Sequence, residues 1–260
     1  MTDTLPARPL AAGQPYRVER HVLAGIPCLI ECPDHDGPLS ALCVVLHGAY
    51  NSKEGKLGVY PELCAHGVAV VLPDAALHGE RQDPQHSPDV LGERNYVWTA
   101  AARTSHEMGR LIDALHAQYG PLPVWAVGSS MGGYTAQFLA LQEPRVTRVA
   151  AVITAGVWQD PRATLPEARA YLDGFRPVQH ARLAPPTALL LLNGTADEVF
   201  PLSAVEQTVQ AYRAAYAQAG CPEQFEARLY EGVPHYTSRG MQRDVVRFLL
   251  DGLPTATLRP

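Results

Sequence analysis

The residues best suited to catalysis in this sequence lie in a short glycine-rich segment. Residues 128–132 read Gly-Ser-Ser-Met-Gly and directly follow an apolar run, residues 124–127. This Gly-x-Ser-x-Gly pattern is typical of a serine on a sharp turn from a strand into a helix, where small residues two positions before and after it avoid steric collision. Ser130 has glycine at both positions and Ser129 at neither, so Ser130 is the predicted nucleophile.

A glycine-rich turn before a helix can also bind a phosphate, because the first backbone N–H groups of a helix have no partner within it. The segment lacks the Gly-Lys-Ser/Thr ending of a nucleotide P-loop and the Gly-x-Gly-x-x-Gly of a dinucleotide site. A serine hydroxyl is a weak nucleophile at neutral pH and needs a general base that a third group orients. The nucleophile interpretation therefore requires an acid and a histidine elsewhere in the chain.

Two downstream residues fit these roles because each follows a predicted strand. Asp197 ends the segment Asn-Gly-Thr-Ala-Asp after an apolar run, and His235 lies in Pro-His-Tyr after the last predicted strand. The carboxyl ends of parallel strands meet at one edge of a sheet, where Ser130 is also expected. The sequence therefore predicts Asp197 as the orienting acid and His235 as the base. Glu198 is an alternative acid, and a turn or helix cap is an alternative role for Asp197.

Attack by a serine produces an oxyanion that preorganised N–H donors must stabilise. One predicted donor is the amide of Met131, the residue after the nucleophile and the first of its helix. The other is the amide of Ala49, because Gly48 allows a sharp turn after an apolar strand; Tyr50 is the neighbouring candidate. We interpret His47 as a structural residue that holds this loop.

The elements that must position these residues alternate along the chain from residue 41 onward. Apolar runs of strand length alternate with longer amphipathic segments, which is typical of βα units around a parallel sheet buried on both faces. A hairpin precedes them. The predicted strands span residues 16–23, 26–32, 41–47, 68–73, 124–128, 149–154, 187–193 and 224–230. The predicted helices span residues 53–66, 95–119, 131–141, 203–219 and 238–250.

A proline-rich insertion, residues 158–186, interrupts this alternation. It carries five prolines and lies between two predicted strands, where it forms either a small lid or a surface loop. Over the carboxyl edge of the sheet, Trp158 and Phe175 would supply apolar wall area for a substrate. We also predict substrate contacts from Tyr50 and Tyr236. The few charges nearby favour short to medium uncharged substrates.

Composition excludes several classes of protein. The chain has 260 residues, is 47% hydrophobic and 18% charged, and carries a net charge of −5 without a basic run, which argues against nucleic acid as a partner. We expect a single domain, residues 1–260. No apolar stretch approaches the roughly 20 residues of a membrane helix, so we expect no membrane partner. The absence of a secretory-signal pattern predicts a cytoplasmic location.

The cysteines and histidines show no metal-ligand spacing. The five cysteines form no Cys-x-x-Cys pair, and no His-Glu-x-x-His motif occurs among the ten histidines. We therefore expect no disulfide framework, no metal site and no cofactor.

Several motifs together resemble the α/β-hydrolase superfamily, and most closely small bacterial esterases of the dienelactone hydrolase and prolyl-oligopeptidase-like branch, of the YitV type. The resemblance covers nearly the whole chain and rests on His47-Gly48, the stretch from Asp74 to Arg81, Gly128-x-Ser130-x-Gly132, Gly194-x-x-Asp197 and Pro234-His235. It implies an α/β fold with a mostly parallel eight-stranded sheet flanked by helices. It also implies the nucleophile, acid and base assigned above. Dienelactone hydrolases use a cysteine nucleophile, and prolyl oligopeptidases carry a propeller domain for which this chain has no room.

These observations predict a serine hydrolase of the carboxylesterase type, acting on a small-molecule ester through an acyl-enzyme. Amide or thioester hydrolysis uses the same three residues and stays an alternative. A non-catalytic ligand-binding protein of this fold is a second alternative, which predicts a missing catalytic residue, whereas all three are present. A homodimer is left open.

Overall fold

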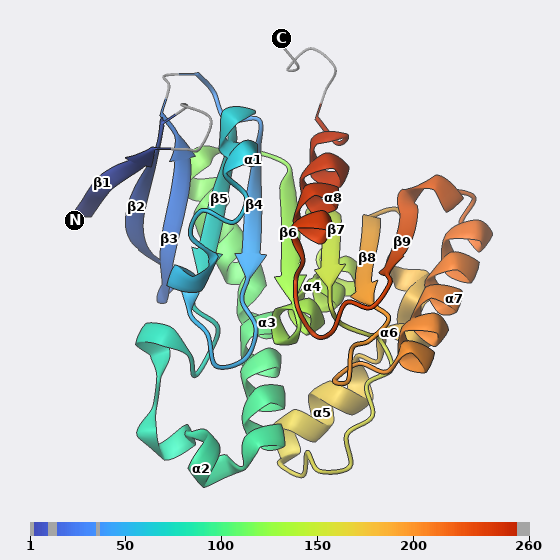
Figure 1. Cartoon of the computed structure of the whole chain (residues 1–260). Coiled ribbons are helices and arrows are strands. Elements are labelled where there is room, and N and C mark those ends of the chain that lie inside the picture. The colour runs from blue at the N-terminus through green and yellow to red at the C-terminus, as the bar shows by residue number, and fades with distance from the viewer. Residues whose placement is uncertain (1–2, 10–14, 35–36, 254–260) are drawn as a thin grey trace.

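The computed structural model describes residues 3–9, 15–34 and 37–253, and side chains from residue 16 onward. Its centre is a nine-stranded sheet with the order β1-β2-β3-β5-β4-β6-β7-β8-β9 (Figure 1). The strands are β1 Asp3–Pro9, β2 Pro15–Leu23, β3 Ile26–Pro33, β4 Ala41–Leu46, β5 Val68–Pro73, β6 Val124–Ser129, β7 Val146–Val152, β8 Ala188–Gly194 and β9 Phe225–Tyr230.

The mostly parallel sheet expected from the sequence is confirmed. From β5 through β4, β6, β7 and β8 to β9 the neighbours pair in parallel, whereas β1, β2 and β3 join the β5 side as antiparallel strands. Strands β2 to β9 are the eight that the sequence predicts. The ninth, β1, reads Asp-Thr-Leu-Pro-Ala-Arg-Pro, which shows no apolar alternation.

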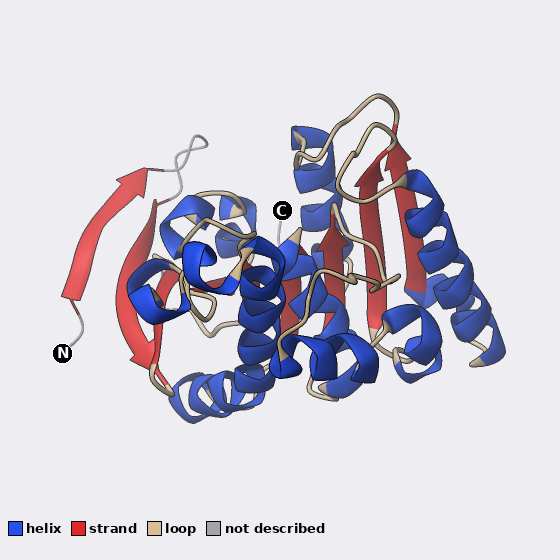
Figure 2. Ribbon diagram, turned by 90° about the horizontal axis from the view of Figure 1, so that it is seen from below, coloured by secondary structure: helices blue, strands red, loops and turns tan. Residues whose placement is uncertain are grey.

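Helices cover both faces of the sheet (Figure 2). Met108, Leu139 and Tyr212 of α3, α4 and α7 pack in one apolar cluster, and Tyr60 and Phe248, beside α1 and on α8, pack in a second cluster on the opposite face. The α-helices are α1 Pro61–Ala65, α2 Pro88–Leu91, α3 Glu93–Tyr119, α4 Met131–Gln142, α5 Pro166–Gly174, α6 Pro177–His180, α7 Leu202–Gln218 and α8 Arg239–Leu250. The 3-10 helices are η1 Lys53–Lys56, η2 Gly79–Arg81, η3 Pro84–His86, η4 Ala181–Leu183 and η5 Pro222–Gln224.

The single helix predicted over residues 53–66 is wrong. The chain forms the short helix η1, leaves helical geometry at Leu57, and starts again as α1 at Pro61. Gly55 and Gly58 weaken helix propagation, and proline is tolerated only in the first turn of a helix, so the apolar spacing alone misled the prediction. None of the described helices is long and apolar enough to cross a membrane.

Glu31 on β3 is a fully buried carboxyl group. Burial raises its pKa to about 7, although the amide of Gly58, which donates to Glu31 Oε1 at 2.6 Å, acts in the opposite direction. The ordinary value is about 4.5, so the folded protein binds this proton more tightly than the unfolded chain. Stability is therefore lost as the pH rises from about 4.5 through about 7.

We expect Glu31→Gln to raise the free energy of unfolding at pH 8 by about 3 kcal/mol. The gain should shrink as the pH falls and vanish below about pH 3.5, where wild-type Glu31 is protonated in both states because this pH lies under its ordinary pKa of about 4.5. Urea unfolding at several pH values measures it. Glu62→Gln, at an exposed position on α1, is the control and should follow the wild type throughout. A pH-independent gain in Glu31→Gln would contradict the assignment.

Candidate active site

Ser130 occupies a strained turn between β6 and α4. Its backbone angles are φ 56° and ψ −118°, a region that non-glycine residues rarely adopt and that costs of order 1–3 kcal/mol. Its N–H donates to the Val152 carbonyl at 3.0 Å, and its own carbonyl accepts from the Gly133 N–H at 2.8 Å. The turn thus lifts the Ser130 side chain out of the sheet at the carboxyl edge of β6.

The two glycines that flank Ser130 are required by close backbone approach. A Cβ atom on Gly128 would lie 2.0 Å from the Gly132 carbonyl oxygen, and one on Gly132 would lie 2.5 Å from the Leu46 carbonyl oxygen. Neither contact is sterically allowed, and the opposing atoms belong to the backbone. The Gly-x-Ser-x-Gly pattern therefore reflects how tightly α4 packs against the ends of β6 and β4.

The structure brings Ser130, His235 and Asp197 together in one hydrogen-bonded chain. His235 Nε2 lies 2.9 Å from Ser130 Oγ, and His235 Nδ1 lies 2.8 Å from Asp197 Oδ2. A carboxylate only accepts, so Nδ1 carries the proton and Nε2 is left to accept the hydroxyl proton. The arrangement is that of a nucleophile, a base and an orienting acid.

Asp197 is fixed by its own loop. Its side chain is fully buried, and its second oxygen, Oδ1, accepts from the backbone N–H groups of Val199 and Phe200 at 2.8 and 2.9 Å. The loop also binds the one that carries His235, because the Ala196 N–H donates to the Val233 carbonyl at 3.1 Å. The acid and the base are therefore held by directly bonded loops after β8 and β9.

His47 orients the loop that contains the predicted donor Ala49. His47 Nε2 accepts from the Ala75 N–H at 3.0 Å, so Nδ1 must carry the proton and donate to the Gly48 carbonyl at 2.8 Å. Burial lowers the pKa of His47 to about 4, which keeps the ring neutral. Because the C=O and N–H of one trans peptide point in opposite directions, the Ala49 N–H is turned away from His47.

The loop and the start of α4 lie beside Ser130. A Cβ atom built on Gly48 would be 3.5 Å from Ser130 Cβ, so Ala49 directly follows a residue in contact with the serine. Met131 is the first residue of the twelve-residue helix α4, where backbone N–H groups have no acceptor within the helix. Both predicted amide donors are thus adjacent to Ser130.

Ser129 points to different surroundings. It is buried as the last residue of β6, and its hydroxyl accepts a hydrogen bond from Lys56 Nζ at 3.2 Å. Within the described part of the chain, no histidine forms a hydrogen bond with its hydroxyl. The contrast supports the choice of Ser130 over its neighbour.

Sequence reasoning missed a buried ionic network behind the Ala49 loop. The fully buried Lys53 donates from Nζ to Asp74 Oδ2 at 2.7 Å and also pairs with Glu54 and Glu80, at 2.9 and 2.5 Å. The backbone N–H groups of Lys53 and Glu80 donate to the Asp74 carboxylate as well. Burial alone would lower the pKa of Lys53, but these acidic partners raise it. The network ties the chain after β4 to the chain after β5.

Exposed apolar side chains border the site. Tyr50 is 58% exposed, Val199 53% and Tyr236 61%, and they follow Ala49, Asp197 and His235 in the three loops of the site. Isolated exposed apolar residues are ordinary, but their concentration on these loops indicates a binding rim. Tyr50 and Tyr236, which the sequence predicts as substrate contacts, therefore lie on this rim.

Two other predicted substrate contacts are placed differently. Trp158 is 1% exposed and packs against Trp98, Tyr134 and Tyr171, so it offers no surface to a substrate and the prediction for it is wrong. Phe175 packs against His106 and Phe138. Phe138 is on α4, about two helical turns from Ser130. The insertion uses these rings for its own packing because a short segment needs a core to fold.

The inner wall beside the base comes from other rings. Phe200 lies with its ring centroid 5.6 Å from that of His235, and Tyr134 lies 5.7 Å from Phe200. Tyr134 follows Ser130 by one helical turn on α4, a spacing that places both on one side of the helix. This spacing from Ser130 is the signal in the sequence that could have identified Tyr134 as a residue of the site.

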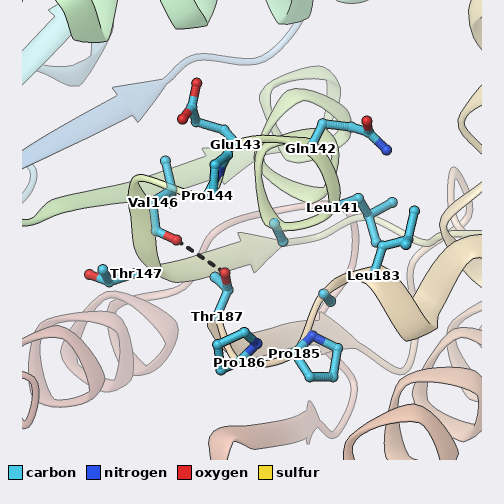
Figure 3. A pocket seen from close by; sticks show the side chains of 12 residues that line it. Leu141, Gln142, Glu143, Pro144, Val146, Thr147, Leu183, Pro185, Pro186 and Thr187 are labelled. Atoms are coloured by element: carbon cyan, nitrogen blue, oxygen red, sulfur yellow. Dashed lines mark hydrogen bonds between the residues drawn. The ribbon is translucent and has the colours of Figure 1, made fainter. Parts of the chain in front are cut away.

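A separate cavity of about 380 Å³ lies at the other end of the sheet (Figure 3). It is lined by the end of α4, the start of β7 and the residues before β8, including Leu141, Val146, Leu183 and Thr187. Thr187 Oγ1 donates to the Val146 carbonyl across it at 3.1 Å. These are the amino ends of the parallel strands, so the cavity is not part of the catalytic site.

The order of the elements and the site agree with a known protein family. A family model described as the alpha/beta hydrolase family matches residues 43–253, which includes Ser130, Asp197 and His235. The chain belongs to this family. Hydrolysis is the expected chemistry of an alpha/beta hydrolase, and the relatives described below include a lipase and an esterase.

Individual relatives agree with this assignment. Over 132 residues the chain is 33% identical to the mouse (Mus musculus) sn-1-specific diacylglycerol lipase ABHD11, a match that covers 50% of this chain and 38% of that protein. The crystal structure of TT1662 from Thermus thermophilus has a TM-score of 0.79 at 28% identity, covering 91% of this chain and 97% of that chain. The Pyrococcus furiosus esterase Pf2001 has the same fold, with a TM-score of 0.63 at 13% identity and coverage of 98% and 94%.

Proposed function

We propose that this alpha/beta hydrolase is a serine hydrolase that cleaves carboxylic esters of small to medium uncharged molecules. The observation that carries the proposal is the continuous hydrogen-bonded chain from Ser130 through His235 to the buried Asp197. The chain leaves His235 Nε2 as an acceptor for the serine proton, which is the state that a general base needs before attack.

In the proposed reaction, Ser130 Oγ attacks the ester carbonyl carbon while His235 Nε2 takes its proton. Asp197 accepts from Nδ1 and stabilises the imidazolium that forms. The amides of Met131 and Ala49 donate to the oxyanion, and α4 adds the positive end of its dipole there. His235 then gives the proton to the leaving alcohol oxygen. It next activates a water molecule, which releases the acid and restores the Ser130 hydroxyl.

The ester class is supported by the rim and by one relative. Tyr50, Val199 and Tyr236 give the entrance three exposed apolar side chains, which supports substrates that carry apolar groups. The partial match to a diacylglycerol lipase is consistent with ester hydrolysis. Amide and thioester hydrolysis use the same residues, so the leaving group must be tested directly.

The test uses a graded series of p-nitrophenyl esters beside matched anilides and thioesters. We expect esters of short to medium acyl chains to give the highest kcat/KM. A uniform absence of hydrolysis by the folded protein would instead favour the non-catalytic alternative.

A fluorophosphonate probe is expected to label Ser130. Ser129→Ala is the matched control and should keep both labelling and activity, because the Ser129 hydroxyl contacts Lys56 and not His235. Peptide mapping by mass spectrometry identifies the adduct. An adduct on Ser129, or none on the folded protein, would contradict the mechanism.

A further inference from the structure

The two edge strands of the sheet are protected to different degrees. At one edge, β1 contains two prolines and its register with β2 shifts between Leu5 and Arg8. Prolines and irregular pairing are devices that prevent an edge strand from pairing with another chain. At the other edge, β9 has no proline and pairs with β8 without a register shift.

The backbone of β9 presents free hydrogen-bonding groups at this edge. The Thr195 N–H donates to the Tyr230 carbonyl at 3.0 Å, so the backbone of Tyr230 faces β8. Backbone groups alternate along a strand, and those of Ala227 and Leu229 therefore face away from β8. No other described residue forms a backbone hydrogen bond with them.

A largely apolar groove lies beside this edge, between α7 and β9; these two elements are at the right of Figure 1. It has a volume of about 300 Å³, with Val205, Val209, Ala227 and Leu229 among its lining residues. Leu229 is 50% exposed, unusual for a large apolar side chain on a sheet. The groove offers room for the side chains of an added strand.

The sequence of β9 is complementary to itself when read in the opposite direction. Around Ala227 it reads Phe225-Glu226-Ala227-Arg228-Leu229. In an antiparallel pair with a two-fold axis through Ala227, Glu226 lies opposite the partner's Arg228, and Phe225 lies opposite Leu229 of the partner subunit. Opposite charges and apolar pairs directly across two strands are stabilising.

The neighbouring registers are disfavoured. In an antiparallel pair, a residue whose backbone groups face the partner strand must lie opposite another such residue. A change of register therefore moves the two-fold axis from one residue to the next. An axis through Glu226 places two glutamates opposite each other, and an axis through Arg228 places two arginines opposite each other. Within one chain Arg228 also binds Glu226 and Asp244, each at 2.8 Å, which holds the guanidinium at this edge.

We propose that this chain forms a two-fold dimer in which β9 pairs antiparallel with β9 of a second copy, centred on Ala227. The pairing extends the sheet across both subunits and covers Leu229. A closed two-fold contact of this kind uses the same surface on both partners.

The dimer is tested by sedimentation velocity over a wide range of concentration. The wild type should shift from the 28.2 kDa of one chain to twice that mass. Ala227→Pro should stay at the mass of one chain, because it removes an outward N–H that β8 does not use. Arg110→Glu, at an exposed position on α3, is the control and should still dimerise.

Two charge variants make the test independent of the proline substitution. Glu226→Arg places arginines opposite arginines and Arg228→Glu places glutamates opposite glutamates, so each variant alone should be monomeric. Mixed together they should form a heterodimer, since every cross-strand pair is again complementary. Circular dichroism and ester hydrolysis check that each variant is folded. A wild type that stays monomeric, a dimer that survives both Ala227→Pro and Glu226→Arg, or folded charge variants that fail to pair would each overturn the proposal.

Discussion

Replacing Ser130 by alanine is expected to lower kcat for ester hydrolysis by about five orders of magnitude. The nucleophile is lost, and what remains is the binding of substrate and the stabilisation of the oxyanion. His235→Ala should cost about as much, because a serine without its base is scarcely deprotonated. Stopped assays with a p-nitrophenyl ester at high enzyme concentration measure the residual rates.

Asp197→Asn should have a smaller effect, of about four orders of magnitude. The asparagine side chain carries no negative charge to accept the hydrogen bond from His235 Nδ1. The backbone N–H groups of Val199 and Phe200 still hold the loop. The double variant Ser130→Ala/His235→Ala should be no worse than either single one, because the residues act as a unit. Additive losses, or an active His235→Ala, would remove these residues from the mechanism.

Replacing Lys53 by methionine is expected to lower the free energy of unfolding by about 3–5 kcal/mol. The substitution leaves the fully buried Asp74 carboxylate without its cation. It also frees the chain after β4, so kcat should fall even at temperatures where the variant is folded, through a loosened Ala49 loop. Chemical denaturation and ester hydrolysis measure the two effects.

Two matched variants separate charge from packing at this network. Glu54→Gln removes the partner of Lys53 that is 54% exposed, and it should change stability by less than about 0.5 kcal/mol. Lys53→Met/Asp74→Asn removes both buried charges while keeping an oxygen that accepts from the backbone, and it should regain part of the loss. A double variant as unstable as Lys53→Met would show that side-chain volume, not charge, is responsible.

The sequence predicts the candidate site well because each part depends on neighbouring residues. Ser130 is identified by glycines two positions away. The contact that requires Gly128 lies within the same turn, whereas the contact that requires Gly132 comes from the Leu46 carbonyl of β4. Asp197 and His235 are identified because each follows an apolar strand, and parallel strands place their carboxyl ends at one edge. Such arguments need only the periodicity of the chain and the geometry of a parallel sheet.

Features that depend on distant residues could not be predicted in the same way. Lys53 and Asp74 are 21 positions apart in the sequence, and nothing local indicates that the lysine will be buried against this acid. Trp158 illustrates the second difficulty. An aromatic residue in an insertion serves equally well as a pocket wall or as the core of the insertion, and only the positions of Trp98 and Tyr171 decide between them.

The insertion between β7 and β8 is fastened along its length to α3. Trp98 Nε1 donates to Asp160 at 3.0 Å, the Thr164 N–H donates to Asn95 at 2.6 Å, and the Tyr171 hydroxyl bonds to Ser105 at 2.7 Å. Swinging it outward would expose buried aromatic rings to water, at a cost of several kcal/mol. The segment is therefore held in place, and we expect turnover to require no opening of it at an oil–water boundary. Hydrolysis of a sparingly soluble ester should then level off at its solubility limit, without the interfacial activation shown by lipases whose lids are mobile.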